Sequence, residues 1–194
     1  MGREKDISAI WQSFLSGDKE SFAYLYNKHV QALYKYGTKL CYDEELVKDA
    51  IQEVFLDLYL KRKKNSIAPD NLRFYLILAL KRNLIKKLQY NRKLIGEEAC
   101  KMLFDPDYNI EKSIIENENE RHLYQRITRM LKKLPAGQKE ALYLQFIESM
   151  EYAEIAQVLN ITIESVRKQV YRALTSIRNE FGGKGIILWV LARG

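Results

Sequence analysis

The sequence has few of the residues that build metal sites and disulfide frameworks. Its 194 residues include two cysteines and two histidines, and Cys41, Cys100, His29 and His122 are isolated from one another. A structural zinc site needs four clustered ligands, so we expect no metal, and we expect no other cofactor. Scarce cysteine is typical of proteins in a reducing cytoplasm, which is where we expect the chain to act.

Proline and long apolar runs are also scarce. The chain has three prolines and no persistent strand-like alternation, which predicts an all-α fold. The longest apolar stretch, residues 186–192, is much too short to cross a bilayer, and the charged N-terminus lacks the apolar run of a signal peptide. No clustered acid pair, catalytic triad or phosphate-binding loop occurs, so we expect neither enzymatic activity nor a small-molecule substrate.

Charge, by contrast, is abundant and uneven. Residues 61–93 contain 11 Lys/Arg and one Asp/Glu, residues 97–120 contain 2 and 8, and residues 121–181 contain 10 and 6. Two basic blocks separated by an acidic one favour two polyanion-binding domains over the ordinary alternative, a solvated charged surface. The predicted organisation is a helical domain at 1–95, an acidic linker at 96–119, a second helical domain at 120–182 and an apolar tail at 183–194.

Apolar residues at helical spacing predict the individual helices. In the first domain we expect helical runs near residues 22–30, 33–40, 43–60 and 72–92. In the second domain we expect helices at 120–134, which Pro135 ends, and at 136–147.

Residues 151–177 have the pattern of a helix-turn-helix. Asn160 tolerates the left-handed backbone of a sharp turn, and Thr162 is suited to cap the second helix. The predicted core stripe of that helix is Ile163, Val166, Val170, Ala173, Leu174 and Ile177. Away from the stripe lie residues able to contact bases and phosphates: Glu164, Ser165, Arg167, Lys168, Gln169, Tyr171 and Arg172. An ordinary pair of surface helices is the alternative interpretation.

The predicted helix at 43–60 has an unusual outward face. Asp49, Gln52 and Glu53 surround Leu56 and Leu60, which lie on the side opposite the core stripe. Two leucines in line inside an acidic patch favour a protein partner with a basic, partly apolar surface over the alternative, chance exposure.

The helix at 72–92 and the preceding loop are basic instead. The loop supplies Lys61, Arg62, Lys63, Lys64 and Asn65, and the helix supplies Tyr75, Arg82, Asn83 and Lys86. Cations interleaved with aromatic and amide groups are suited to single-stranded DNA, because they neutralise phosphates and hold unstacked bases. A solvated basic face is the alternative.

Three segments together resemble bacterial RNA polymerase sigma factors of the extracytoplasmic-function type. The first domain contains DEELVKDAIQEVFLDLYLK and LRFYLILALKRNLIKKL, and the second contains LPAGQKEALYLQFIESMEYAEIAQVLNITIESVRKQVYRALTSIR. With the helix around FAYLYNKHVQALYKYG, the resemblance covers roughly residues 10–181. One departure is Asn160, which stands where glycine is common.

The resemblance implies a subunit that directs core RNA polymerase to promoters. Its first domain would be region 2, which binds the clamp of the largest polymerase subunit through Asp49, Gln52, Glu53 and Leu56. The same domain would bind and melt the minus-10 element with the basic loop and helix. The second domain, region 4, would recognise the minus-35 element and contact the flap of the second subunit. The acidic linker would follow the polymerase's RNA channel.

Two further expectations concern partners and alternatives. The resemblance implies an anti-sigma factor, often membrane-bound, that restrains the protein. From the residues alone, a stand-alone helix-turn-helix regulator remains the competing hypothesis. The acidic patch with its two leucines distinguishes the hypotheses, because only a sigma factor needs it to bind polymerase.

Overall fold

A computed structural model describes residues 7–63, 71–95, 104, 126 and 129–181. Every secondary-structure element in this described part is a helix, which confirms the all-α prediction. The chain divides into two compact units, residues 1–102 and 103–194. None of the described helices is long and apolar enough to span a membrane.

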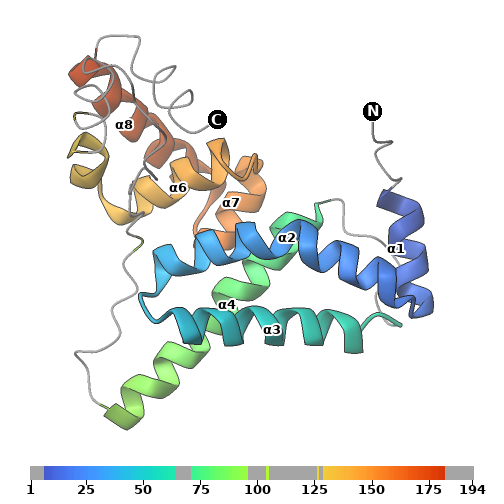
Figure 1. Ribbon diagram of the computed structural model, residues 1–194. Coiled ribbons are helices and arrows are strands. Elements are labelled where there is room, and N and C mark those ends of the chain that lie inside the picture. The colour runs from blue at the N-terminus through green and yellow to red at the C-terminus, as the bar shows by residue number, and fades with distance from the viewer. Residues whose placement is uncertain (1–6, 64–70, 96–103, 105–125, 127–128, 182–194) are drawn as a thin grey trace, which may run out of the picture. The chain divides into compact units, whose positions relative to one another are not determined.

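The first unit contains four helices. They are α1 (Ile7–Ser16), α2 (Lys19–Leu40), α3 (Glu44–Leu60) and α4 (Leu72–Ile95). Figure 1 shows α2 and α3 side by side with α4 crossing them, and each of these three helices contacts the other two. The predicted helical runs at 22–30 and 33–40 are in fact one helix, because Leu25, Leu33 and Leu40 continue a single buried stripe without a break.

The helices of the first unit approach one another closely at Gly37 of α2. A Cβ atom placed on Gly37 would lie 2.6 Å from Cγ1 of Val47 in α3 and 3.5 Å from Cδ2 of Leu80 in α4. Both neighbours are completely buried. The absence of a side chain at Gly37 therefore lets the three helices close around one core.

Aromatic side chains attach α1 to this core. Trp11 and Phe14 of α1 are buried, and their ring centroids are 5.2 Å apart. Phe14 stacks on Phe22 of α2 at 5.9 Å, and Phe22 lies 5.2 Å from Tyr59 at the end of α3. These rings bury a large apolar area at one end of the unit.

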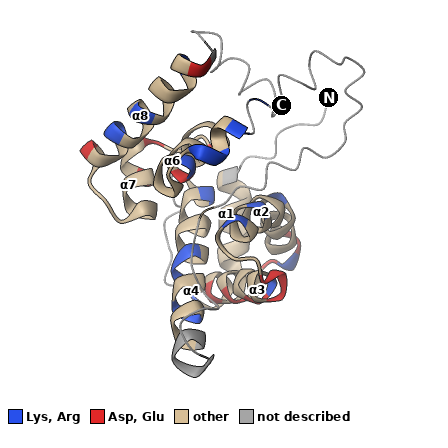
Figure 2. Ribbon diagram, turned by 90° about the vertical axis from the view of Figure 1, so that its left-hand side faces the viewer, with Lys and Arg blue, Asp and Glu red and all other residues tan. Residues whose placement is uncertain are grey.

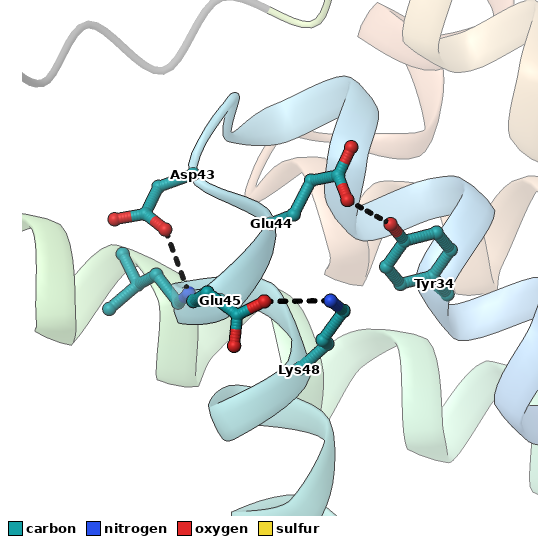
Figure 3. Close-up of polar contacts among 6 residues, drawn as sticks. Tyr34, Asp43, Glu44, Glu45 and Lys48 are labelled. Carbon is teal, nitrogen blue, oxygen red and sulfur yellow. Dashed lines mark hydrogen bonds and ion pairs between the residues drawn. The ribbon is translucent and has the colours of Figure 1, made fainter.

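The start of α3 is fixed by polar contacts (Figure 3). The Asp43 carboxylate caps the helix by accepting a 3.0 Å hydrogen bond from the backbone N–H of Leu46. Glu44 accepts a 2.7 Å hydrogen bond from the Tyr34 hydroxyl of α2, and this bond raises the pKa of Tyr34. Glu45 pairs with Lys48 at 2.7 Å. The first turn of α3 is thus acidic, as the helix dipole favours, and tied to α2.

The second unit contains α6 (Ala136–Phe146), α7 (Tyr152–Leu159) and α8 (Ile163–Phe181), preceded by a helical stretch at residues 129–133. Each of the three labelled helices contacts the other two. Phe104, from the predicted linker, is buried, and its ring lies 5.5 Å from that of Tyr143 in α6.

One predicted core residue of α8 is not in the core. Val166, Val170, Ala173 and Ile177 are buried as expected and Leu174 is half-buried, but Ile163 is 42% exposed. Ile163 is the first residue of α8, so no earlier residue of the same helix lies over its side chain. The prediction that placed Ile163 in the buried stripe is therefore wrong.

Candidate nucleic-acid and polymerase interfaces

The turn between α7 and α8 has the predicted local structure. Asn160 ends α7 with φ 53° and ψ 48°, the left-handed conformation that asparagine tolerates. Thr162 then caps α8, because its hydroxyl oxygen accepts a 3.1 Å hydrogen bond from the backbone N–H of Ser165. At the start of α7, the Glu154 carboxylate accepts a 2.9 Å hydrogen bond from the Glu151 N–H. These contacts set the angle at which α8 leaves α7.

The outward face of α8 is polar and mostly cationic. Five of the seven predicted DNA-binding residues are exposed on it: Glu164, Arg167, Lys168, Tyr171 and Arg172. Glu164 and Lys168 form a 2.7 Å ion pair one turn apart, with side chains 74% and 63% exposed. A pair so exposed contributes little to stability, so the Lys168 ammonium can exchange this partner for a phosphate at small cost.

The other two predicted residues of α8 are engaged within the unit. Ser165 is half-buried, and its hydroxyl lies 2.8 Å from that of Thr162. Gln169 is also half-buried, and its Oε1 atom would lie 2.6 Å from a Cβ atom on Gly137 in α6. The carboxamide of Gln169 is thus packed against α6, apart from the exposed cations.

The predicted polymerase-binding residues share the exposed face of α3. Asp49, Gln52 and Glu53 are exposed, and Leu56 and Leu60 are 56% and 66% exposed. The predicted exposure of the two leucines is confirmed. Figure 2 shows acidic residues on α3 and basic residues on α4, two helices of the first unit.

Glu53 has a second role that joins these two helices. Its carboxylate accepts a 2.8 Å hydrogen bond from the Asn83 amide and pairs at 2.6 Å with the Lys87 ammonium, both from α4. Both hydrogen bonds lower the pKa of Glu53, and the one from Lys87 has the larger effect. Asn83, predicted to contact DNA, therefore has its amide directed to α3.

The basic loop that follows α3 is partly tied to that helix. Lys61 pairs with Asp57 at 2.7 Å, which raises the pKa of Lys61, and both side chains are more than half exposed. The Arg62 guanidinium lies 4.1 Å from the centroid of the Tyr59 ring and donates a 2.8 Å hydrogen bond to the Tyr59 carbonyl. Lys63 is exposed, while Lys64 and Asn65 lie outside the described residues.

On α4 the predicted stripe is divided. Arg82 and Lys86 are exposed one turn apart, and Tyr75 is half-buried. Tyr90, which flanks them, is 65% exposed. The exposed part of α4 therefore presents two cations and an aromatic ring, a combination that can bind phosphates and stack on a base.

The sequence predicted neither the exposure of Ile163 nor the ion pair between Lys87 and Glu53. Ile163 matched the apolar period of α8, and only its position as the first helical residue indicated exposure. Lys87 lies beside the predicted stripe of α4, and its pairing with Glu53 joins residues 34 positions apart. No local signal in the sequence identifies a contact of that range.

Comparison with known families accounts for both units. Residues 25–94 match the family model described as Sigma-70 region 2, and residues 124–177 match that described as Sigma-70, region 4. Together these matches cover more than half of the chain.

Curated relatives align along nearly the whole chain. The ECF RNA polymerase sigma factor SigK of Mycobacterium ulcerans is 19% identical over 182 residues, which make up 92% of this chain and 95% of the relative. SigK of Mycobacterium bovis (strain BCG / Pasteur 1173P2) is 20% identical over 178 residues, with coverages of 90% and 92%.

Two solved structures have a similar fold. CnrH in complex with the cytosolic domain of CnrY has a TM-score of 0.54 at 20% identity, covering 88% of this chain and 94% of that one. RpoE in complex with the anti-sigma factor NepR, from Bartonella quintana, has a TM-score of 0.57 at 16% identity, with coverages of 83% and 96%.

The chain belongs to the sigma-70 family, and within it to the extracytoplasmic-function sigma factors. It is therefore a subunit that binds core RNA polymerase and directs promoter-specific initiation of transcription. The alternative of a stand-alone helix-turn-helix regulator is not favoured.

Proposed function

We propose that the exposed face of α3 is the part of region 2 that binds the clamp of the largest polymerase subunit. The observation that carries this assignment is the exposure of Leu56 and Leu60 beside Asp49 and Gln52. A basic, partly apolar surface complements such a face in both charge and hydrophobicity. Glu53 belongs to the same face, although its carboxylate also holds α4.

The cationic side of α4 is proposed to bind the separated strands of the minus-10 element. Arg82 and Lys86 supply phosphate contacts, and Tyr75 and Tyr90 supply aromatic rings near them. Lys61 and Lys63 extend the positive charge to the loop after α3. In this assignment Arg62 supports the loop by packing on Tyr59, and Asn83 is held by Glu53 until DNA binds.

The outward face of α8 is proposed to enter the major groove of the minus-35 element. Arg167, Lys168 and Arg172 are the exposed cations of this face and complement DNA phosphates and guanine edges. Region 4 also contacts the flap of the second polymerase subunit in this proposal. The polymerase performs the catalysis, and the chain contributes binding and specificity without an active site of its own.

An anti-sigma factor is a further proposed partner. RpoE of Bartonella quintana forms a complex with the anti-sigma factor NepR, and CnrH forms one with the cytosolic domain of CnrY. Both chains share the fold of this protein. A membrane-bound anti-sigma factor would hold the chain away from polymerase until a signal releases it.

The polymerase assignment is tested by removing the two groups at its centre. We expect the double variant Asp49→Ala/Leu56→Ala to lose co-elution with core RNA polymerase and promoter-dependent run-off transcription, because both substitutions remove exposed contacts without disturbing the core. The matched control is Asn27→Ala/Gln31→Ala, two exposed residues one turn apart on α2. Unchanged co-elution of the Asp49/Leu56 variant would contradict the assignment.

A further inference from the structure

Two apolar side chains lie among the cations of α8. Ile163 is 42% exposed and Tyr171 is 70% exposed. With Arg167 between them they occupy positions i, i+4 and i+8, which places all three along one edge of the outward face. Val166 and Val170, at 0% and 2% exposed, define the buried face; Ile163 lies at its margin and Tyr171 further round the helix. Both side chains therefore leave a substantial apolar surface outside the core of the second unit.

The surroundings of these side chains indicate what covers them. A single exposed apolar residue needs no explanation, but these two share their face with Arg167, Lys168 and Arg172. Three cations on one helix face complement the phosphates of a DNA duplex. In a helix-turn-helix, the N-terminal residues of the second helix contact base edges in the major groove, and Ile163 is the first residue of α8.

The major groove offers one strongly apolar group, the C5 methyl of thymine. An isoleucine has no hydrogen-bonding group, so it distinguishes bases only through such a contact. The Tyr171 ring offers a larger apolar surface for the same purpose. The three cations of this face favour binding to duplex DNA. Within the major groove, the aliphatic side chain of Ile163 can make a favourable contact only with a thymine methyl group.

We propose that Ile163 and Tyr171 contact thymine methyl groups of the minus-35 element and thereby specify A·T pairs at two positions. This inference rests on the proposed function, in which α8 enters that duplex. Eight residues correspond to about 12 Å along a helix. The two methyl-dependent positions should therefore lie no more than about four base pairs apart, at 3.4 Å per step.

The test uses the full-length chain assembled with core RNA polymerase. Promoter duplexes are selected from a library randomised in the upstream element, and each thymine of the selected element is then replaced singly by deoxyuridine. This replacement removes the C5 methyl and leaves base pairing intact. We expect the affinity of the complex to fall about fourfold at one or two thymines, the effect of removing one buried methyl group.

Variants assign each methyl effect to a side chain. In Ile163→Ser the deoxyuridine effect should disappear at one position, and in Tyr171→Ser at the other. Arg167→Ala is the matched control from the same edge of α8, and it should weaken binding to every template while both methyl effects persist. Circular dichroism of each variant checks that α8 remains folded, as expected for substitutions at exposed positions.

The outcomes separate this inference from the function beneath it. If no sequence is enriched, the proposed binding of α8 to the minus-35 element fails. If a sequence is enriched but contains no A·T pair, or if deoxyuridine has no effect at any thymine, only the methyl inference is overturned. It is also overturned if Ile163→Ser and Tyr171→Ser reduce polymerase association while all methyl effects remain, because those side chains then contact protein.

Discussion

The close approach at Gly37 leads to a sharp prediction about the stability of the first unit. The variant Gly37→Ala places a methyl group 2.6 Å from Cγ1 of Val47, a short, β-branched side chain with no exposed surface. Overpacking of this kind costs about 1–3 kcal/mol. Replacing a helical glycine by alanine returns about 0.5–1 kcal/mol of helix stability. We therefore expect Gly37→Ala to lower the free energy of unfolding by about 1 kcal/mol, and by no more than about 2.5 kcal/mol.

The assay follows Trp11, which is buried in the aromatic cluster of α1. The chain has two tryptophans, so in a Trp189→Phe background the fluorescence reports the first unit alone during urea unfolding. In the double variant Gly37→Ala/Val47→Ala, residue 47 no longer has the Cγ1 atom with which the new methyl group would clash. This double variant should be more stable than the sum of the two single effects predicts, because the substitutions relieve one another.

Gly137 provides a matched control with the same geometry and a different neighbour. A Cβ atom there would also lie 2.6 Å from another atom, but that atom is Oε1 at the end of the flexible Gln169 side chain. We expect Gly137→Ala to be close to neutral when unfolding is followed by circular dichroism. The reasoning is refuted if Gly37→Ala is as stable as the parent, or if the two alanine substitutions cost the same.

Two further predictions concern a turn and a buried histidine. Asn160→Ala should destabilise the second unit by about 1 kcal/mol, because the left-handed conformation costs alanine more free energy than asparagine. Asn160→Gly should be neutral or stabilising, since glycine adopts this conformation without strain. Thermal melts of the two variants test this difference. Burial, with Arg73 and Lys28 nearby, lowers the pKa of His29 to about 4. Below its ordinary value of 6.5 the unfolded chain therefore binds a proton that the folded chain does not, so stability is lost as the pH falls from 6.5 to 4, by up to about 1.4 kcal/mol per pH unit. Urea midpoints across this range should fall less steeply for His29→Asn than for His122→Asn, and equal slopes would count against a buried neutral His29.

Features governed by nearest neighbours along the chain could be predicted from the sequence. The left-handed Asn160 and the capping Thr162 depend on local backbone geometry, which residue type indicates directly. The exposure of Leu56 and Leu60 follows from helical period, because the opposite face of α3 already contains enough apolar residues for the core. Period alone failed at Ile163, where a helix end changes what surrounds the side chain.

Contacts between helices could not be predicted in this way. Gln169 is a residue type common on DNA-binding surfaces, but its carboxamide packs against Gly137 of α6. A helical wheel gives the direction of a side chain and does not give the element that meets it. The same limit applies to Asn83, whose amide reaches a carboxylate 30 residues away.

That contact links the two proposed surfaces of the first unit. Glu53 lies on the face of α3 assigned to polymerase, and its carboxylate holds Asn83 and Lys87 of α4, the helix assigned to DNA. A polymerase cation that pairs with Glu53 competes with Lys87 and frees polar groups of α4 for phosphates or bases. Because the Glu53 side chain is 52% exposed, solvent screening keeps this linkage to about 1 kcal/mol or less. Exchange of partners at one carboxylate is then a physical route by which binding of polymerase favours binding of the melted strand.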